Sequence, residues 1–261
     1  MNPALWIAKT GLDAQQTRMG VISNNLANVN TMGYKRGRAA FSDLIYQNLK
    51  QVGAQSSQNT QLPSGLAMGT GVQTTATQKI FTQGNIAQTG NTFDMAINGR
   101  GFFQILRPDG TQAYTRDGAF QVSREGRVVT STGYDLQPAI VVPPDAQSIT
   151  VGVDGIVSAQ LPGQAEPATI GAIQLADFIN PAGLEPIGDN QYRESGASGA
   201  PQIGTPALTG LGSLVQGALE TSNVNTVEEM VNMIETQRAY EMNSKAIASA
   251  DQMLQTLNQR L

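Results

Sequence analysis

The chain has 261 residues with a formal net charge of −4, and 14% of them are charged against roughly 25% in an ordinary globular protein. No run of Lys or Arg is present to neutralise a phosphate backbone, so we expect no nucleic-acid partner. Because the sequence contains neither His nor Cys, it lacks the residues of a Ser-His-Asp triad, a cysteine nucleophile or a zinc or iron–sulfur site, and we predict no catalytic residue, no metal or cofactor site and no small-molecule substrate.

The first predicted element is a helix from about Pro3 to about Val29, since proline suits a helix start and apolar residues recur every seven positions. Gln15 is the single polar break in this stripe, and Gly33 suits a C-terminal cap. The two positions of the repeat hold Leu5, Leu12, Met19 and Leu26, and Ala8, Ile22 and Val29. We do not expect this helix to be a cleaved secretory signal, because Lys9, Asp13 and Arg18 break the apolar run that such a signal needs. If the protein leaves the cytoplasm, the export route is expected to spare the helix.

A matching stripe occupies the C-terminal end. It comprises Met233, Tyr240, Ile247, Leu254 and Leu261, with Ala250 and Leu257 on the same side. Two such stripes predict a coiled coil between the ends of the chain. The residues alone leave open whether the stripes pair within one monomer or also pack between subunits.

The region after the first helix is polar. Residues Ala39 to Lys50 are amphipathic and predict a short helix, whereas Gln51 to Thr77 are rich in Gly, Ser and Gln. A loop of this length is uncommon without a function, so we interpret it as an extended arm or a flexible linker.

From Gly84 to about Gly217 short β segments alternate with turn residues, which predicts an antiparallel β domain built of successive hairpins. The predicted strands are Phe102 to Arg107, Gln112 to Arg116, Ala119 to Arg124, Ala139 to Val142, Ser148 to Val151, Gly155 to Ala159 and Ala168 to Leu175. Asp109, Asp117 and Asp154 could be the acids of a glycoside hydrolase. Each directly precedes a glycine, however, and we interpret them as turn residues.

Three blocks of sequence resemble the flagellar rod and hook family over essentially the whole chain: residues 23–36, residues 96–103 with 114–118, and residues 220–245. Within the first block the residues that match the family signature are Asn24, Asn25, Leu26, Ala27, Asn28, Asn30, Thr31, Gly33, Tyr34 and Lys35. The side chains of the four asparagines, at 24, 25, 28 and 30, either form hydrogen bonds between subunits or form local caps and turns.

The resemblance implies an α+β structural subunit, not an enzyme, that forms a helical homopolymer. Its parts would be a terminal helical domain of residues 1–33 and 222–261, a linker or arm of residues 34–83 with part of 205–221, and a central antiparallel β domain of residues 84–215. The implied partners are the proximal rod proteins, the hook protein, the P- and L-ring proteins and the flagellar type III export apparatus. The implied location is the basal body, in the periplasm and through the outer-membrane ring.

Within the family, the length and the polar segment resemble the distal rod subunits, which form the rigid drive shaft below the hook. The residues of this proposed rod-stiffening segment are Tyr46, Gly53, Leu62, Pro63 and Gly65. The alternatives are another axial rod or hook-type subunit, or an extracellular β fibre or adhesin. The fibre or adhesin would not need apolar heptads at both ends.

Overall fold

The computed structural model describes residues 3–51, 55–57, 60–61, 64–163, 166–208 and 210–259. The chain divides into two compact units. The first unit contains residues 1–27, 37–78 and 225–261, and the second contains residues 28–36 and 79–224. Neither helix in the described part of the chain combines the length and the apolarity needed to span a bilayer.

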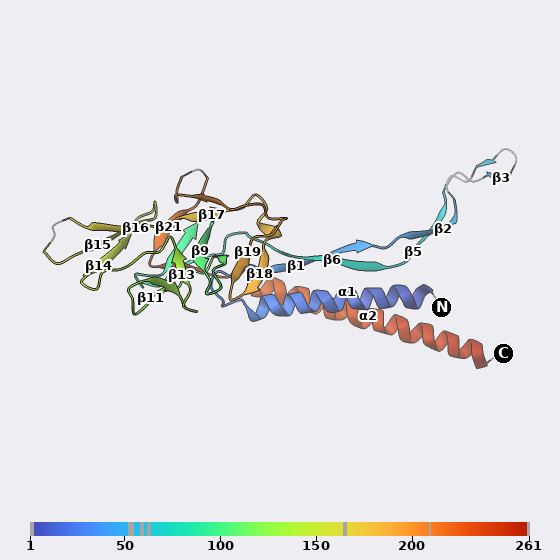
Figure 1. Cartoon of the computed structure of the whole chain (residues 1–261). Helices are drawn as coiled ribbons and strands as arrows, with labels where there is room; N and C mark the ends of the chain where they lie inside the picture. The colour runs from blue at the N-terminus through green and yellow to red at the C-terminus, as the bar shows by residue number, and fades with distance from the viewer. Residues whose placement is uncertain are drawn as a thin grey trace. The chain divides into compact units, whose positions relative to one another are not determined.

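In the first unit, α1 (Pro3–Ala27) and α2 (Thr226–Gln259) lie side by side, as Figure 1 shows. Asn225 caps α2, because its Oδ1 accepts the backbone N–H of Val227 at 3.1 Å. Glu228 and Glu229 follow in the first turn, where the helix dipole favours negative charge. The predicted pairing of the chain ends is therefore confirmed. The predicted cap of α1, Gly33, is the last residue of a turn at residues 28–33 and does not directly follow the helix.

The rest of the first unit is an arm of paired strands. These are β1 (Gly37–Asp43), β2 (Tyr46–Lys50), β3 (Gln55–Ser57), β4 (Thr60–Gln61), β5 (Leu66–Gly69) and β6 (Val72–Lys79), and the pairs are β1 with β6, β2 with β5 and β3 with β4. The prediction of a helix over Ala39 to Lys50 is wrong. The segment is extended because residues 66–79, rich in Thr and other β formers, supply pairing partners that its own pattern does not reveal.

Helix α1 also packs against this arm. The Asn25 side chain donates to the carbonyl of Gly37 at 2.9 Å and accepts the N–H of the same residue at 2.7 Å. Thr10 Oγ1 accepts the N–H of Val72 at 3.3 Å. Thus α1 touches α2 on one side and the β1–β6 pair on another.

The second unit is an antiparallel β domain, as predicted. Its strands are β7 (Ile86–Gln88), β8 (Met95–Asn98), β9 (Phe102–Leu106), β10 (Gln112–Thr115), β11 (Phe120–Val122), β12 (Val128–Thr130), β13 (Asp135–Gln137), β14 (Ser148–Val151), β15 (Ile156–Gln160), β16 (Ala168–Ala172), β17 (Leu175–Asp177), β18 (Glu185–Gly188), β19 (Gln191–Arg193), β20 (Gln202–Gly204), β21 (Ser213–Gln216) and β22 (Ala218–Glu220), with a 3₁₀ turn, η1, at Pro181–Gly183. The main sheet has the order β11-β12-β13-β9-β10-β19-β18, and β17 pairs with both β9 and β20.

Strand β9 is the centre of the main sheet and carries the core on both faces. Phe103 and Ile105 lie in one buried cluster with Leu136, Leu175 and Leu214. Phe102, on the opposite face, lies in a second cluster of aromatic residues, where rings meet edge to face: Phe81, Tyr114, Phe178 and Tyr192. The alternation follows from the two-residue period of a strand.

The predicted turns are mostly hairpin turns. Gly110, Gly126 and Gly155 have φ of +76°, +79° and +84°, as tight Asp-Gly and Glu-Gly turns require. Two details differ from the prediction. Asp117-Gly118 does not close a hairpin, since β10 pairs with β9 and β19 while β11 pairs with β12. Residues 139–142 contribute only an isolated bridge, between Val141 and Arg127.

Candidate assembly surface and buried junction

The apolar stripe of α1 is only partly covered. Ile22 is buried, and the remaining members are half-buried: Leu5, Ala8, Leu12, Met19, Leu26 and Val29. At the polar break, Gln15 has a buried side-chain oxygen with no hydrogen-bond partner. The stripe of α1 thus retains apolar surface after the helix has packed within its own unit.

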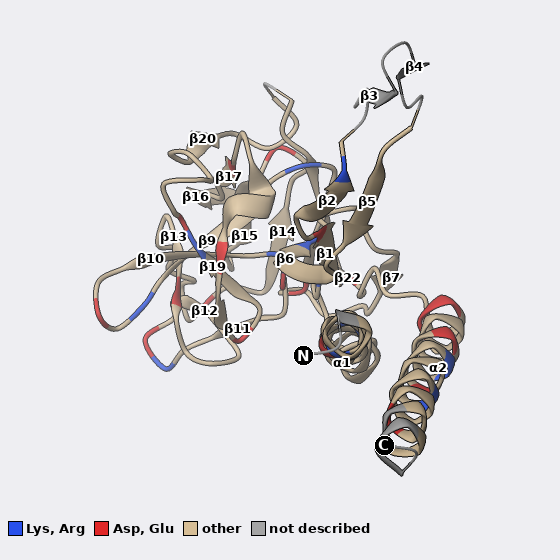
Figure 2. Cartoon of the chain, turned by 90° about the vertical axis from the view of Figure 1, so that its right-hand side faces the viewer, with Lys and Arg blue, Asp and Glu red and all other residues tan. Residues whose placement is uncertain are grey.

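The side of α2 that meets α1 is polar or small. Asn232 accepts a hydrogen bond from Arg18 at 3.5 Å, and the Asn243 amide lies 3.1 Å from where a side chain on Gly11 would begin. Asn243 belongs to a series of residues spaced seven apart on this side of α2. Its other members are buried: Glu229, Thr236 and Ala250. Figure 2 shows that α2 also carries more of the charged residues than α1.

The predicted α2 stripe lies beside this polar seam. Met233 and Ile247 are half-buried, Tyr240 is 41% exposed and Ala250 is buried. The side chains of Leu254 and Leu257, and all of Leu261, lie outside the described residues. The α1–α2 contact is therefore shifted round α2 from the apolar heptad toward residues 229, 236, 243 and 250.

An apolar patch lies on the opposite side of α2. Its members are Val227, Met230, Val231 and Ile234, each between 48% and 68% exposed. The spacing i, i+3, i+4, i+7 places them on one face of the helix, turned away from Glu229 and Thr236. We call these four residues the outer stripe of α2. An apolar face that the chain leaves uncovered while burying polar residues on the other side indicates a contact with another molecule.

The signature residues in the last turn of α1 and directly after it include both bonded and exposed side chains. Asn25 is buried and bonded to Gly37, and the Asn28 side chain accepts the hydroxyl of Thr31 at 3.2 Å. Asn24, Ala27 and Asn30 are exposed. Asn28 thus makes a bond within a turn, whereas Asn25 bonds to the first residue of β1. That these asparagines also bond between subunits stays a prediction.

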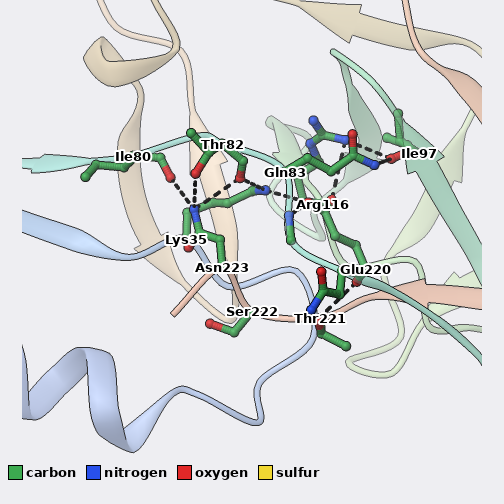
Figure 3. A network of polar contacts seen from close by, with 12 residues as sticks. Lys35, Ile80, Thr82, Gln83, Ile97, Arg116, Glu220, Thr221, Ser222 and Asn223 are labelled. Carbon is green, nitrogen blue, oxygen red and sulfur yellow. Dashed lines mark hydrogen bonds and ion pairs between the residues drawn. The ribbon is translucent and has the colours of Figure 1, made fainter. Parts of the chain in front are cut away.

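The end of the signature enters a buried ionic cluster in the second unit (Figure 3). Lys35 Nζ lies 2.6 Å from Glu220 Oε1, and both side chains are fully buried. Lys35 also donates to the Thr82 carbonyl at 2.8 Å, and the N–H of Gly84 donates to the same Glu220 oxygen at 2.8 Å. The Glu220 carboxylate on β22 therefore accepts hydrogen bonds from two separate segments of the chain, at Lys35 and at Gly84.

Arg116, which follows β10, faces the other carboxylate oxygen. Its Nη1 is 3.4 Å from Glu220 Oε2, and its Nη2 donates to the Gly99 carbonyl at 2.6 Å. Burial lowers the pKa of Lys35, Glu220 opposes that shift and Arg116 adds to it. Burial likewise lowers the pKa of Arg116, against the attraction of Glu220. One carboxylate therefore serves two buried cations.

Backbone hydrogen bonds reinforce the cluster. The N–H of Gly33 donates to the Glu220 carbonyl at 2.8 Å, and the N–H of Arg36 donates to Asn223 Oδ1 at 2.7 Å. The Asn223 amide in turn donates to the Ile80 carbonyl at 2.8 Å. We call the segments 33–36, 79–84 and 220–223, with Arg116, the junction, because these segments lead along the chain into β1, β6 and α2.

The predicted rod-stiffening segment lies on the arm. Tyr46 is exposed and Gly65 is half-buried, whereas Gly53, Leu62 and Pro63 lie outside the described residues. Further exposed apolar side chains accompany Tyr46 on β2 and β5 and on the residue before β2: Ile45, Leu49, Leu66 and Met68. The arm thus offers a second apolar surface.

Among the described residues, no group of three or more carboxylates is placed to hold a metal ion. The candidate sites described above are the helix faces, the arm and the junction.

Comparison with known proteins identifies the chain. Models for the flagella basal body rod protein, the flagellar hook protein FlgE/F/G D1 domain and the flagellar basal body rod FlgEFG protein C-terminal match residues 5–35, 96–159 and 215–260. The flagellar basal-body rod protein FlgG of Buchnera aphidicola subsp. Schizaphis graminum is 56% identical over 259 residues, covering 99% of this chain and 100% of the relative. The chain belongs to the FlgE/F/G family of flagellar hook and rod proteins.

Two relatives from one organism show which branch of the family is more similar to this chain. The FlgG of Caulobacter vibrioides is 47% identical to this FlgE/F/G-family chain, covering 98% of each protein. The FlgF of the same strain is 35% identical, covering 100% of this chain and 98% of the relative. The predicted function, a structural distal rod subunit rather than an enzyme, another axial subunit or a fibre, is confirmed.

Sequence reasoning named Lys35 but missed the roles of Arg116 and Glu220. All three lie in blocks that resembled the FlgE/F/G family: 33–36, 114–118 and 220–225. The available signal was chemical, since only 14% of the residues are charged and each of the three blocks contains at least one of them. The pairing itself could not be predicted, because 185 residues separate Lys35 from Glu220.

Proposed function

We propose that this rod subunit polymerises through its terminal helices into the helical shaft of the distal rod, which transmits torque from the motor to the hook. The observation that carries the proposal is the outer stripe of α2, an exposed apolar face on a helix whose inner face is polar. The half-buried stripe of α1 is the complementary surface on a neighbouring subunit. Contacts between unlike surfaces generate an open helical polymer where the rotation from one subunit to the next does not close a ring.

The energetics suit a polymer of many weak contacts. Full burial of one such side chain contributes about 1.5–3 kcal/mol, so covering a half-exposed residue contributes about 1 kcal/mol at each contact. Repeated along a shaft, these contributions give a stable assembly without any strong single bond.

The arm would make the shaft straight and stiff. Its apolar residues, including Ile45 and Leu49, are exposed in the single chain and would wedge against neighbouring subunits. In this proposal residues 1–33 and 222–261 form the inner tube. Residues 34–83, with part of 205–221, form the stiffening layer, and residues 84–215 form the outer β domain.

The remaining partners follow from a place in the rod. We propose contacts with the proximal rod proteins below, the hook protein above and the P- and L-ring proteins around the shaft. The chain would reach the periplasm through the flagellar type III export apparatus, and the shaft would continue through the outer-membrane ring.

The deciding experiment is to tag the chain in its own organism, purify basal bodies and locate the tag by immuno-electron microscopy. Label on the straight segment directly below the hook supports the proposal. Label along the curved hook would assign a hook-type role, and absence from basal bodies would overturn the proposal.

A further inference from the structure

The junction is built from charge where an apolar contact would be cheaper. Taking ions out of water costs several kcal/mol each, and a buried ion pair seldom stabilises a protein more than packed apolar residues would. Lys35, Arg116 and Glu220 are all buried, yet the cluster holds two cations and one anion. Stability alone does not explain this choice, but a requirement for one defined pairing of segments does.

The three charges play unequal parts. Arg116 is tied to its own surroundings by the carbonyls of Ile97 and Gly99. Lys35 is tied to the Thr82 carbonyl. Only Glu220 touches both cations and the Gly84 N–H, so its carboxylate is the common point of the cluster. Removing that carboxylate leaves two cations buried together, whereas removing the ammonium of Lys35 leaves a neutral Arg116–Glu220 pair.

We propose that Glu220 is a positioning residue for assembly: its carboxylate locks the junction, and the lock sets the segments that lead into β1, β6 and α2 in the arrangement that polymerisation needs. This inference rests on the proposed function. Opening the lock frees residues 33–36 and 220–223 while the core around β9 and β10 stays folded. The subunit then remains a folded protein that does not build a rod.

The test uses the full chain with E220Q, K35M and the K35M/E220Q double variant. Hydrogen exchange of the purified protein measures opening of the junction, and the rod content of basal bodies measures assembly when the variant is the only copy. We expect E220Q to speed exchange at residues 33–36 by at least about a hundredfold, leave β9 and β10 protected and abolish rods. We expect K35M to change exchange at residues 33–36 less than about tenfold.

The double variant separates a charge lock from simple packing. In E220Q, Lys35 and Arg116 are buried together without the Glu220 carboxylate. Because K35M removes one of these two cations, the amides of residues 33–36 should exchange more slowly in K35M/E220Q than in E220Q. Additive effects would overturn the inference, as would wild-type rods from E220Q. Loss of protection in β9 and β10 of E220Q would also overturn it, since Glu220 would then serve general folding.

The matched control is E185Q, which removes a carboxylate from the half-exposed Glu185–Arg193 pair in the same unit, where the charges are 2.7 Å apart. We expect wild-type exchange and normal rods from this variant. If wild type and E185Q themselves fail to appear in rods, the proposed function fails. If they appear and E220Q does too, only the role of Glu220 fails.

Discussion

Gly33 combines two backbone demands that no other residue type meets together. Its φ is +68°, in the left-handed region, and a Cβ there would lie 2.6 Å from the backbone nitrogen of Asp117. Gly33 therefore lets the chain after α1 pass close to the β10–β11 connection. We expect G33A to destabilise the second unit by at least about 3 kcal/mol, because strain and a backbone clash add. Urea unfolding followed by circular dichroism measures this free energy.

Gly110 provides the matched control for Gly33. Its φ is +76°, but a Cβ there would meet nothing within 4 Å. G110A should therefore cost only the left-handed strain, about 1 kcal/mol. Equal losses in the two variants would show that close approach at Gly33 has no energetic weight.

Tyr114 makes the free energy of unfolding decrease as the pH rises into the alkaline range. Burial raises the pKa of Tyr114 to about 12 from an ordinary value of 10.0, and the nearby Glu194 adds to the rise. The unfolded chain ionises first, so this contribution is complete below about pH 10 and is lost as the pH climbs from there to about 12. Burial raises the pKa of Tyr192 as well, which acts in the same direction.

Lys35, which is buried, and Lys79, which is half-buried, act in the opposite sense. Burial lowers the pKa of Lys35 and of Lys79, so their contribution to stability grows as the pH rises toward 10.5. Y114F isolates the tyrosine. Between about pH 9 and about pH 11, the urea concentration at the midpoint of unfolding should fall further for wild type than for Y114F. Equal falls in the two proteins would contradict the assignment to Tyr114.

At the scale of elements, sequence periodicity predicted which segments are helical at the ends of the chain and missed which faces meet. The heptad of Met233, Tyr240 and Ile247 correctly located α2, but the contact with α1 uses Asn232 and Asn243 instead. A helix that serves two partners divides its faces between them, and a single stripe cannot show which partner takes which. The helix wrongly predicted at Ala39 to Lys50 fails for a related reason, because the partners of β2 in strand β5 lie outside the predicted segment, from Lys50 opposite Leu66 to Tyr46 opposite Gly69.

The β domain was predicted better because its turns carry local signals. Gly110, Gly126 and Gly155 take the positive φ that their sequence context indicates. Gly118 is the exception, since a Cβ there would overlap the carbonyl oxygen of Met95 and the glycine serves a close approach of strands distant in sequence. Ionic pairing across the junction was equally invisible, because no periodicity or turn rule links residues 35, 116 and 220.

The outer stripe of α2 is testable as a polymerisation surface. I234D places a charge on the stripe at an exposed position, so we expect the subunit to fold with less than about 1 kcal/mol of change and rods to be lost. Circular dichroism checks the fold, and electron microscopy of basal bodies checks the rods.

I179D makes the same chemical change at an exposed isoleucine of the second unit. Rods should form normally with I179D. If I234D also builds rods, the outer stripe is not a subunit contact.

For the whole molecule, the arm is the part that would distinguish a stiff shaft from a flexible one. Deleting residues 47–62 removes most of β2 together with the exposed Leu49, and it leaves α1, α2 and the β domain intact in sequence. Because the helices carry the proposed polymer contacts, assembly should persist while the wedge between neighbours is lost. We expect rods that are curved in electron micrographs where wild-type rods are straight.

A second variant separates the apolar contacts from the length of the arm. I45D/L49D keeps the β2–β5 pairing, whose register runs from Tyr46 opposite Gly69 to Lys50 opposite Leu66, but makes its exposed surface charged. Curved rods from both variants would assign stiffness to apolar packing of the arm, since burial of these side chains against a neighbour stabilises a contact that bending would open. Straight rods from the deletion would show that stiffness resides in the helices or in the β domain.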